Sequence, residues 1–251
     1  MSSKTTPSIT HIGNYRLVLA SASPRRREMM AAHSYEPLLH PAHVEETIPS
    51  FLSPEEAVMH LSRTKGLAVK EAWNDDSISQ PTDAAASQPA VIVSADTIVV
   101  FDGEILGKPT DRDDAFRMLS MMAGNSHQVM TGVSLTLSDV AFTKCFYEVT
   151  DVTFGDITED AIKEYVDTDE PYDKAGSYAI QGNFGKHIVK TTGDIDNVIS
   201  FPWTRFVKEL KEPKPGDEPG KEPEDMAKGK SSIGKESNNH KSRIKYAYAY
   251  F

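Results

Sequence analysis

The chain has 251 residues and a formal net charge of −10, with 27 Lys and Arg against 37 Asp and Glu. A single cysteine excludes an intramolecular disulfide framework and an all-cysteine zinc site. No apolar run approaches the roughly 18 residues of a membrane span, and residues 1–15 lack the apolar segment of a secretory signal. We therefore expect a protein of the cytosol, a reducing and aqueous compartment, with no membrane partner.

Composition divides the chain into three parts. Residues 1–14 are predicted to be a flexible N-terminus. Residues 212–251 carry eight Lys or Arg and seven Asp or Glu, separated by Pro and Gly, with few apolar residues. Such a segment cannot bury enough surface to offset the entropy of ordering, so we predict a disordered, charged tail. Residues 15–211 are expected to form the domain, with residues 74–90 as an inserted surface loop that is polar and unusually long.

The predicted elements alternate between strands and helices. Residues 15–20 form a strand, after which Ser23 and Pro24 begin a helix as N-cap and first helical residue. A capping box at residues 53–56 opens a second helix that ends at residue 73. The β-branched run 91–100 indicates a buried strand. The remaining expectations are a helix at 111–123 stopped by a glycine, a hairpin of strands at 129–137 and 142–154, a helix at 158–166, strands near 187–190 and 197–201, and a helix at 203–211. This alternation favours an α/β or α+β fold with a mixed sheet.

Three arginines follow the first strand, in the run SASPRRR at residues 21–27. A helix N-terminus carries free N–H groups and a partial positive charge, so cations normally disfavour this end. Three of them in an acidic protein suggest that an anion binds there, with phosphate as the first choice. The structural alternative is a solvated face paired with neighbouring acids, and local physics alone leaves the two alternatives balanced.

Asp96 interrupts the buried β-branched strand. A carboxylate in such a strand must be paired, bind a metal or have a shifted pKa. This favours a functional role over a structural aspartate that is hydrogen-bonded at a strand bend. Glu45 and Glu46 form an acidic pair that could help to hold Mg²⁺, although the pair alone is weak evidence. His127 is interpreted as a capping or core histidine.

Two lysines have open interpretations. Lys65 falls on the same helical stripe as Val58 and Leu61, so it either snorkels to solvent or reaches a site at the helix edge. Lys108 follows a predicted turn and is, by default, an ordinary surface lysine. Residues 170–182, EPYDKAGSYAIQG, mix charges, small residues and an amide, which is typical of a binding segment. A satisfied loop network is the alternative.

The chain resembles the Maf family, also called septum-formation-inhibitor Maf-like proteins, in four ordered motifs: LASASPRRREMM, SADTIVVFDGEILGKPTDRDDAFRMLSMMAG, HQVMTGV and DEPYDKAGSYAIQG. The resemblance runs from about residue 15 to residue 210. It implies an inosine triphosphate pyrophosphatase-like fold, with a long mixed sheet flanked by helices and a cleft between two lobes. It also implies the activity of a nucleoside triphosphate pyrophosphatase, an enzyme that cleaves its substrate between the α and β phosphates with a divalent metal, Mg²⁺ or Mn²⁺. Members of the family commonly form homodimers, so a homodimer is expected.

The resemblance further implies roles for individual residues. Asp96 matches the proton acceptor, and it is expected to hold the metal together with Glu46; whether it acts as base or only as metal ligand stays open. Arg25, Thr97 and Gln181 match positions that set base specificity and resemble the subgroup acting on dTTP and UTP. The other expected substrate-binding residues are Ser21, Ser23, Arg26, Lys65, Lys108, Asp173 and Lys174.

The leading functional hypothesis is a house-cleaning pyrophosphatase for dTTP, UTP and modified pyrimidine nucleotides. One alternative is a regulator of cell division that acts by binding, and another is a pyrophosphatase for modified purine nucleotides such as 7-methyl-GTP. Residues 1–211 carry a net charge of −11, which argues against nucleic acid as a partner. Ala179 stands where the family usually has glycine, a departure that bears on specificity.

Overall fold

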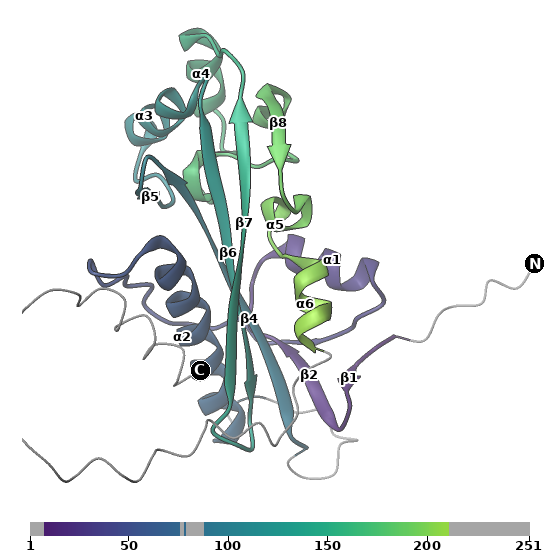
Figure 1. Ribbon diagram of the computed structural model, residues 1–251. Helices are drawn as coiled ribbons and strands as arrows, with labels where there is room; N and C mark the ends of the chain where they lie inside the picture. The colour runs from purple at the N-terminus through teal and green to yellow at the C-terminus, as the bar shows by residue number, and fades with distance from the viewer. Residues whose placement is uncertain (1–7, 76–77, 79–87, 211–251) are drawn as a thin grey trace, which may run out of the picture. The chain divides into compact units, whose positions relative to one another are not determined.

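The computed structural model describes residues 8–75, 78 and 88–210 (Figure 1). The chain divides into two units, residues 1–207 and 208–251, of which the first contains the sheet and its flanking helices. The predicted tail at residues 212–251 lies outside the described residues, as does most of the predicted insertion at 74–90. None of the described helices is long and apolar enough to cross a membrane.

A single mixed sheet runs through the first unit. Its strand order is β1-β2-β4-β6-β7-β8, with β3 beside β2 and β5 beside β4. β2 runs parallel to β3 and β4, and the other neighbours are antiparallel. The predicted mixed sheet is therefore confirmed. The strands are β1 (His11–Ile12), β2 (Tyr15–Leu19), β3 (Leu38–Leu39), β4 (Ala90–Phe101), β5 (Glu104–Leu106), β6 (Ser126–Leu137), β7 (Thr143–Phe154) and β8 (Ile188–Thr192).

Helices flank both faces of this sheet. The longest, α2, covers one face of β4 and β6, and α5 lies against β6 and β7 on the opposite face (Figure 1). The helices are α1 (Pro24–Ala32), α2 (Pro54–Asn74), α3 (Arg112–Met122), α4 (Glu159–Val166), α5 (Ile195–Ile199) and α6 (Trp203–Leu210), with short 3₁₀ turns η1 (Ala175–Ser177) and η2 (Asn183–His187).

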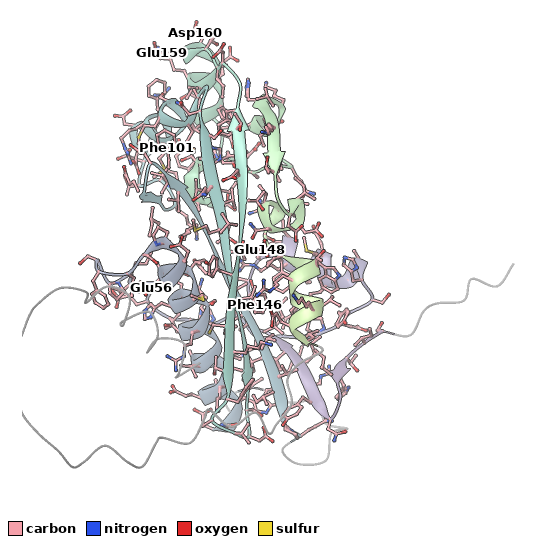
Figure 2. All side chains as sticks on the ribbon, in the orientation of Figure 1. Glu56, Phe101, Phe146, Glu148, Glu159 and Asp160 are labelled. Atoms are coloured by element: carbon pink, nitrogen blue, oxygen red, sulfur yellow. The ribbon has the colours of Figure 1, made fainter. Side chains whose placement is uncertain are left out.

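Local sequence signals determine where the first helices begin. The Ser23 side chain accepts a hydrogen bond from the backbone N–H of Arg26, which caps α1. Ser53 and Glu56 form the predicted capping box of α2, and Figure 2 labels Glu56 in its first turn. Because these polar side chains satisfy the free N–H groups of the first turn, both helix starts are confirmed.

Two expectations need correction. Residues 197–201 are not a strand, because α5 occupies most of this segment. The Asp194 side chain caps α5, and the Asn197 amide donates hydrogen bonds to oxygens on β6 and β7. These contacts outweigh the strand preference of Val198 and Ile199. At the other end, β1 pairs with β2, so the predicted flexible N-terminus at residues 1–14 must be shortened.

The sheet has a free edge in its middle. β2 pairs with β4 as far as Val93, and β5 begins to pair with the same side of β4 at Val99. Among the described strands, none pairs with residues 94–98 of β4 on this side, whereas β6 pairs along the other side without a break. The backbone around Asp96 and Thr97 is therefore open to the chain segments that follow β2 and β5.

Two glycines let α2 approach the sheet closely. A Cβ atom on Gly132, the residue opposite Asp96 on β6, would lie 2.3 Å from the carbonyl oxygen of Val58. A Cβ atom on Gly66 of α2 would lie 2.8 Å from the hydroxyl oxygens of Ser94 and Ser134. This close approach brings the Lys65 side chain of α2 to the middle of β4.

Candidate active site

A cavity of about 680 Å³ lies along the free edge of β4. Its wall includes the turn between β2 and α1, part of α2, the turn after β5, the segment 173–181 and the end of α5. All twelve residues that are expected to act in catalysis, substrate binding or metal binding line this cavity: Ser21, Ser23, Arg25, Arg26, Glu46, Lys65, Asp96, Thr97, Lys108, Asp173, Lys174 and Gln181. Residues that span 160 positions of the chain thus share one surface.

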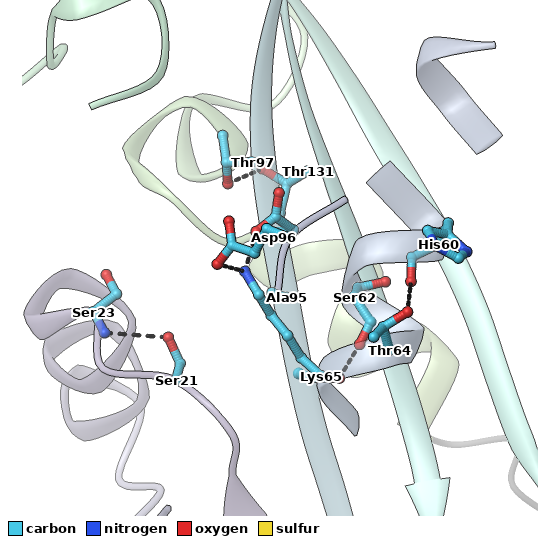
Figure 3. A network of polar contacts seen from close by, with 12 residues as sticks. Ser21, Ser23, His60, Ser62, Thr64, Lys65, Ala95, Asp96, Thr97 and Thr131 are labelled. Atoms are coloured by element: carbon cyan, nitrogen blue, oxygen red, sulfur yellow. Dashed lines mark hydrogen bonds and ion pairs between the residues drawn. The ribbon is translucent and has the colours of Figure 1, made fainter. Parts of the chain in front are cut away.

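Lys65 joins two carboxylates at the centre of this cavity. Its ammonium group donates a hydrogen bond to Asp96 Oδ1 (Figure 3) and lies 3.0 Å from Glu46 Oε1. The side chains of Lys65 and Asp96 are each only 12% exposed. Lys65 therefore reaches the site rather than snorkelling, and its charge compensates for the burial of the Asp96 carboxylate.

Arg26 is buried and bonded almost entirely to the protein. Its Nε donates to the Ser200 carbonyl at 3.0 Å, Nη1 donates to the Ala95 carbonyl at 2.7 Å and to Ser21 Oγ at 3.2 Å, and Nη2 donates to Thr97 Oγ1 at 3.1 Å. Burial lowers the pKa of this guanidinium, an effect that the nearby Asp96 charge opposes. With four of five N–H donors so used, Arg26 chiefly ties α1 to β4 and to the residue after α5.

The neighbouring cations have different surroundings. No side-chain hydrogen bond or ion pair joins Arg25 or Lys108 to another residue in the described ranges, although the Arg25 charge interacts with the Asp173 carboxylate, and both cations line the cavity. Lys174 donates to the Asp173 carboxylate and, at 2.5 Å, to the Glu170 carbonyl. Arg25 and Lys108 therefore offer charge that an anionic ligand can neutralise.

The segment 170–183 is folded on itself. The Glu170 carboxylate accepts hydrogen bonds from the backbone and side-chain amides of Asn183, at 2.9 Å and 2.7 Å, and from the Tyr165 hydroxyl at 3.1 Å. The satisfied network that the sequence left as an alternative is present, and it presents Gln181 to the cavity. The same segment thus forms the hydrogen-bonded network and part of the cavity wall.

His127 is a core residue. It is 2% exposed, and its Nε2 lies 2.6 Å from the hydroxyl of Tyr178, which lines the cavity. Burial lowers the pKa of His127 from 6.5 to about 4 and raises the pKa of Tyr178. The pair joins β6 to the segment that carries Gln181.

The buried imidazole predicts an acid-sensitive fold. Between pH 6.5 and about 4, the unfolded chain binds a proton at His127 that the folded chain excludes, so stability falls as pH falls through this window. We expect the free energy of unfolding to fall by about 3 kcal/mol because of this group. Urea denaturation at pH 7 and at pH 4.5 measures most of this loss. His127→Gln, which cannot titrate, should flatten that part of the slope. Equal slopes in both proteins would contradict the assignment.

Some residues that build the site were not predicted from the sequence. Glu170 and Tyr178 lie in the dense motif 170–182, so the motif was the available signal, although it did not separate them from their neighbours. Ala95 and Ser200 act through backbone carbonyls. Since every residue carries such a group, no sequence pattern marks them.

The oxygen donors fit a metal that is shared with a ligand. Mg²⁺ commonly takes one or two protein carboxylates together with substrate phosphates. The cavity offers the Asp96 and Glu46 carboxylates, both of which are paired with the Lys65 ammonium. In the part of the chain that the structure describes, no group of three or more His, Cys, Asp or Glu could hold a metal by itself.

These features define an α/β protein with a cleft for a polyanionic ligand. A family model described as Maf-like protein matches residues 16–213, so the chain belongs to this family. The dTTP/UTP pyrophosphatase of Agathobacter rectalis is 41% identical over 202 residues, covering 78% of this chain and 96% of that protein. Proteins of the same name from Bacillus cereus and Bacillus anthracis are each 39% identical, covering 78% of this chain and 95% of each relative.

Proposed function

We propose that the protein is a nucleoside triphosphate pyrophosphatase that hydrolyses dTTP and UTP to the monophosphate and pyrophosphate. The observation that carries this proposal is the buried Lys65–Asp96 pair on the free edge of β4, in one cavity with Arg25, Lys108 and Lys174. Phosphoryl transfer needs positioning and charge neutralisation more than covalent help from the protein. The names of the relatives favour dTTP and UTP over 7-methyl-GTP.

Cations and hydroxyls of the cavity bind the phosphates. Lys108 supplies positive charge to the phosphates, and its side chain forms no hydrogen bond or ion pair with another described residue. Ser21 Oγ accepts a hydrogen bond from the backbone N–H of Ser23 (Figure 3) and another from Arg26, so its own proton is free for a phosphate oxygen. Lys174 lines the same cavity and adds a further positive charge.

Asp96 acts on the attacking water. The water oxygen attacks the α phosphorus, the bond to the bridging oxygen breaks, pyrophosphate leaves, and the water proton passes to the Asp96 carboxylate. Lys65 holds Oδ1 of this carboxylate, which leaves Oδ2 for the proton. Asp96 and Glu46 are also the residues that would hold Mg²⁺ or Mn²⁺, and such a metal supplies further neutralisation of phosphate charge.

Gln181, Thr97 and Arg25 recognise the base in this proposal. A glutamine side chain offers both a donor and an acceptor, and its amide donor suits the carbonyl groups of uracil and thymine. A cytosolic location, a homodimer and the absence of a nucleic-acid partner stay predictions of the sequence.

A substrate panel tests this function. Purified protein is incubated with UTP, dTTP, CTP, GTP, ATP and 7-methyl-GTP in the presence of Mg²⁺ or Mn²⁺, and released pyrophosphate is measured. We expect UTP and dTTP to give the highest kcat/KM. A preference for a purine nucleotide would refute the base assignment, and no release from any triphosphate would refute the function.

A further inference from the structure

Thr131 forms part of a hydrogen-bonded chain behind the cavity. It is fully buried on β6, directly opposite Thr97 on β4. The two hydroxyl oxygens lie 2.9 Å apart, as Figure 3 shows. The Thr131 hydroxyl also contacts the carbonyl oxygen of Asn197 at 3.3 Å, and Arg26 Nη2 contacts Thr97 Oγ1 at 3.1 Å.

The ends of this chain fix the direction of every bond in it. The Asn197 carbonyl can only accept, so the single proton of the Thr131 hydroxyl points toward it. Thr131 must then accept its bond to Thr97, which directs the Thr97 proton away from the cavity. The Arg26 guanidinium can only donate, so it occupies one lone pair of Thr97. The second lone pair of Thr97 Oγ1 therefore remains available to accept a hydrogen bond from a ligand.

We propose that Thr131 is a positioning residue that makes Thr97 solely a hydrogen-bond acceptor toward the cavity, and thereby selects a pyrimidine that carries an N3–H. Uracil and thymine have this donor, whereas N3 of cytosine is itself an acceptor. If cytosine bound in the same pose, Thr97 Oγ1 and cytosine N3 would both be acceptors. Each would have lost its water without gaining a hydrogen bond, which disfavours cytosine. This inference rests on the proposed function, because it places the base against Thr97.

Removal of the Thr131 hydroxyl tests the inference. In Thr131→Val the Thr97 proton loses its acceptor and can turn toward the base, where it can donate to cytosine N3. We expect the ratio of kcat/KM for UTP to that for CTP to fall at least tenfold, mainly through KM. Thr131→Ser retains the hydroxyl and should keep the wild-type ratio within twofold. If Thr131 had a purely structural role, the substitution would lower kcat/KM for UTP and for CTP alike. An unchanged ratio in folded Thr131→Val would therefore overturn the inference.

A second measurement uses the wild-type protein and is informative even where Thr131→Val fails to fold. N3-methyl-UTP lacks the N3–H donor, whereas 5-methyl-UTP keeps this donor and carries its extra methyl group elsewhere on the ring. We expect N3-methyl-UTP to lose at least a hundredfold in kcat/KM and 5-methyl-UTP to be turned over like UTP. Comparable turnover of both analogues would overturn the role of Thr97 as acceptor. Failure of the proposed function is distinguishable, because wild-type protein would then leave UTP itself intact.

Discussion

Asp96→Asn is expected to lower kcat for UTP by about a thousandfold, in the range found for general acid–base groups, while the protein keeps its fold. The asparagine amide has nearly the same shape, and its oxygen can still accept the hydrogen bond from Lys65. It has neither the charge to hold a metal nor the basicity to take a proton. Pyrophosphate release and thermal denaturation, measured on the same preparation, check both halves of this expectation.

Asp173→Asn is the matched control for this variant. Asp173 lines the same cavity, but its side chain is 75% exposed and paired with Lys174 rather than with Lys65. Its loss should reduce kcat less than tenfold. Two outcomes would count against the role of Asp96: full activity in Asp96→Asn, or a variant that is unfolded at the assay temperature, which would make Asp96 structural.

Gly132→Ala is expected to destabilise the protein by about 3 kcal/mol or more, because the added methyl group would overlap backbone atoms. Its Cβ would lie 2.3 Å from the Val58 carbonyl oxygen and 2.5 Å from the Val58 carbonyl carbon. Val58 lies within the hydrogen-bonded backbone of α2, near its N-terminal end, and these atoms cannot move aside singly, so this part of α2 must shift from the sheet. Because α2 carries Lys65, the contact with Asp96 and the activity should fall as well.

Urea denaturation of Gly132→Ala and Gly107→Ala measures this effect with a built-in comparison. A Cβ atom on Gly107 meets nothing within 4 Å, so that substitution should change stability by no more than about 0.5 kcal/mol. An unchanged unfolding midpoint in Gly132→Ala would show that α2 tolerates a wider spacing than the structure has.

The secondary structure was largely predictable because its signals are local. A serine before a proline, or a serine three residues before a glutamate, marks a helix start through hydrogen bonds that the segment makes with itself. The short helix α5 was not predictable in this way. Its stability depends on the bonds of Asn197 to β6 and β7, and the partners of those bonds lie far away in the sequence.

The sequence predicted residues that share this cavity, but not the contacts that hold them there. Arg25 and Arg26 are neighbours in one motif, yet Arg26 is bound to four protein oxygens, whereas the Arg25 side chain forms no hydrogen bond or ion pair with a described residue and lines the cavity. Adjacent side chains of an α-helix point about 100° apart around the helix axis, and only the fold decides which of them meets β4. The direction of the Thr97 hydroxyl likewise depends on three residues from three different elements.

The central claim is that this cavity holds one nucleoside triphosphate and cleaves it between the α and β phosphates. Separation of the products from UTP, in the presence of Mg²⁺, tests it most directly. We expect UMP and pyrophosphate in equal amounts. UDP with inorganic phosphate, or UTP left intact by folded protein, would contradict the claim.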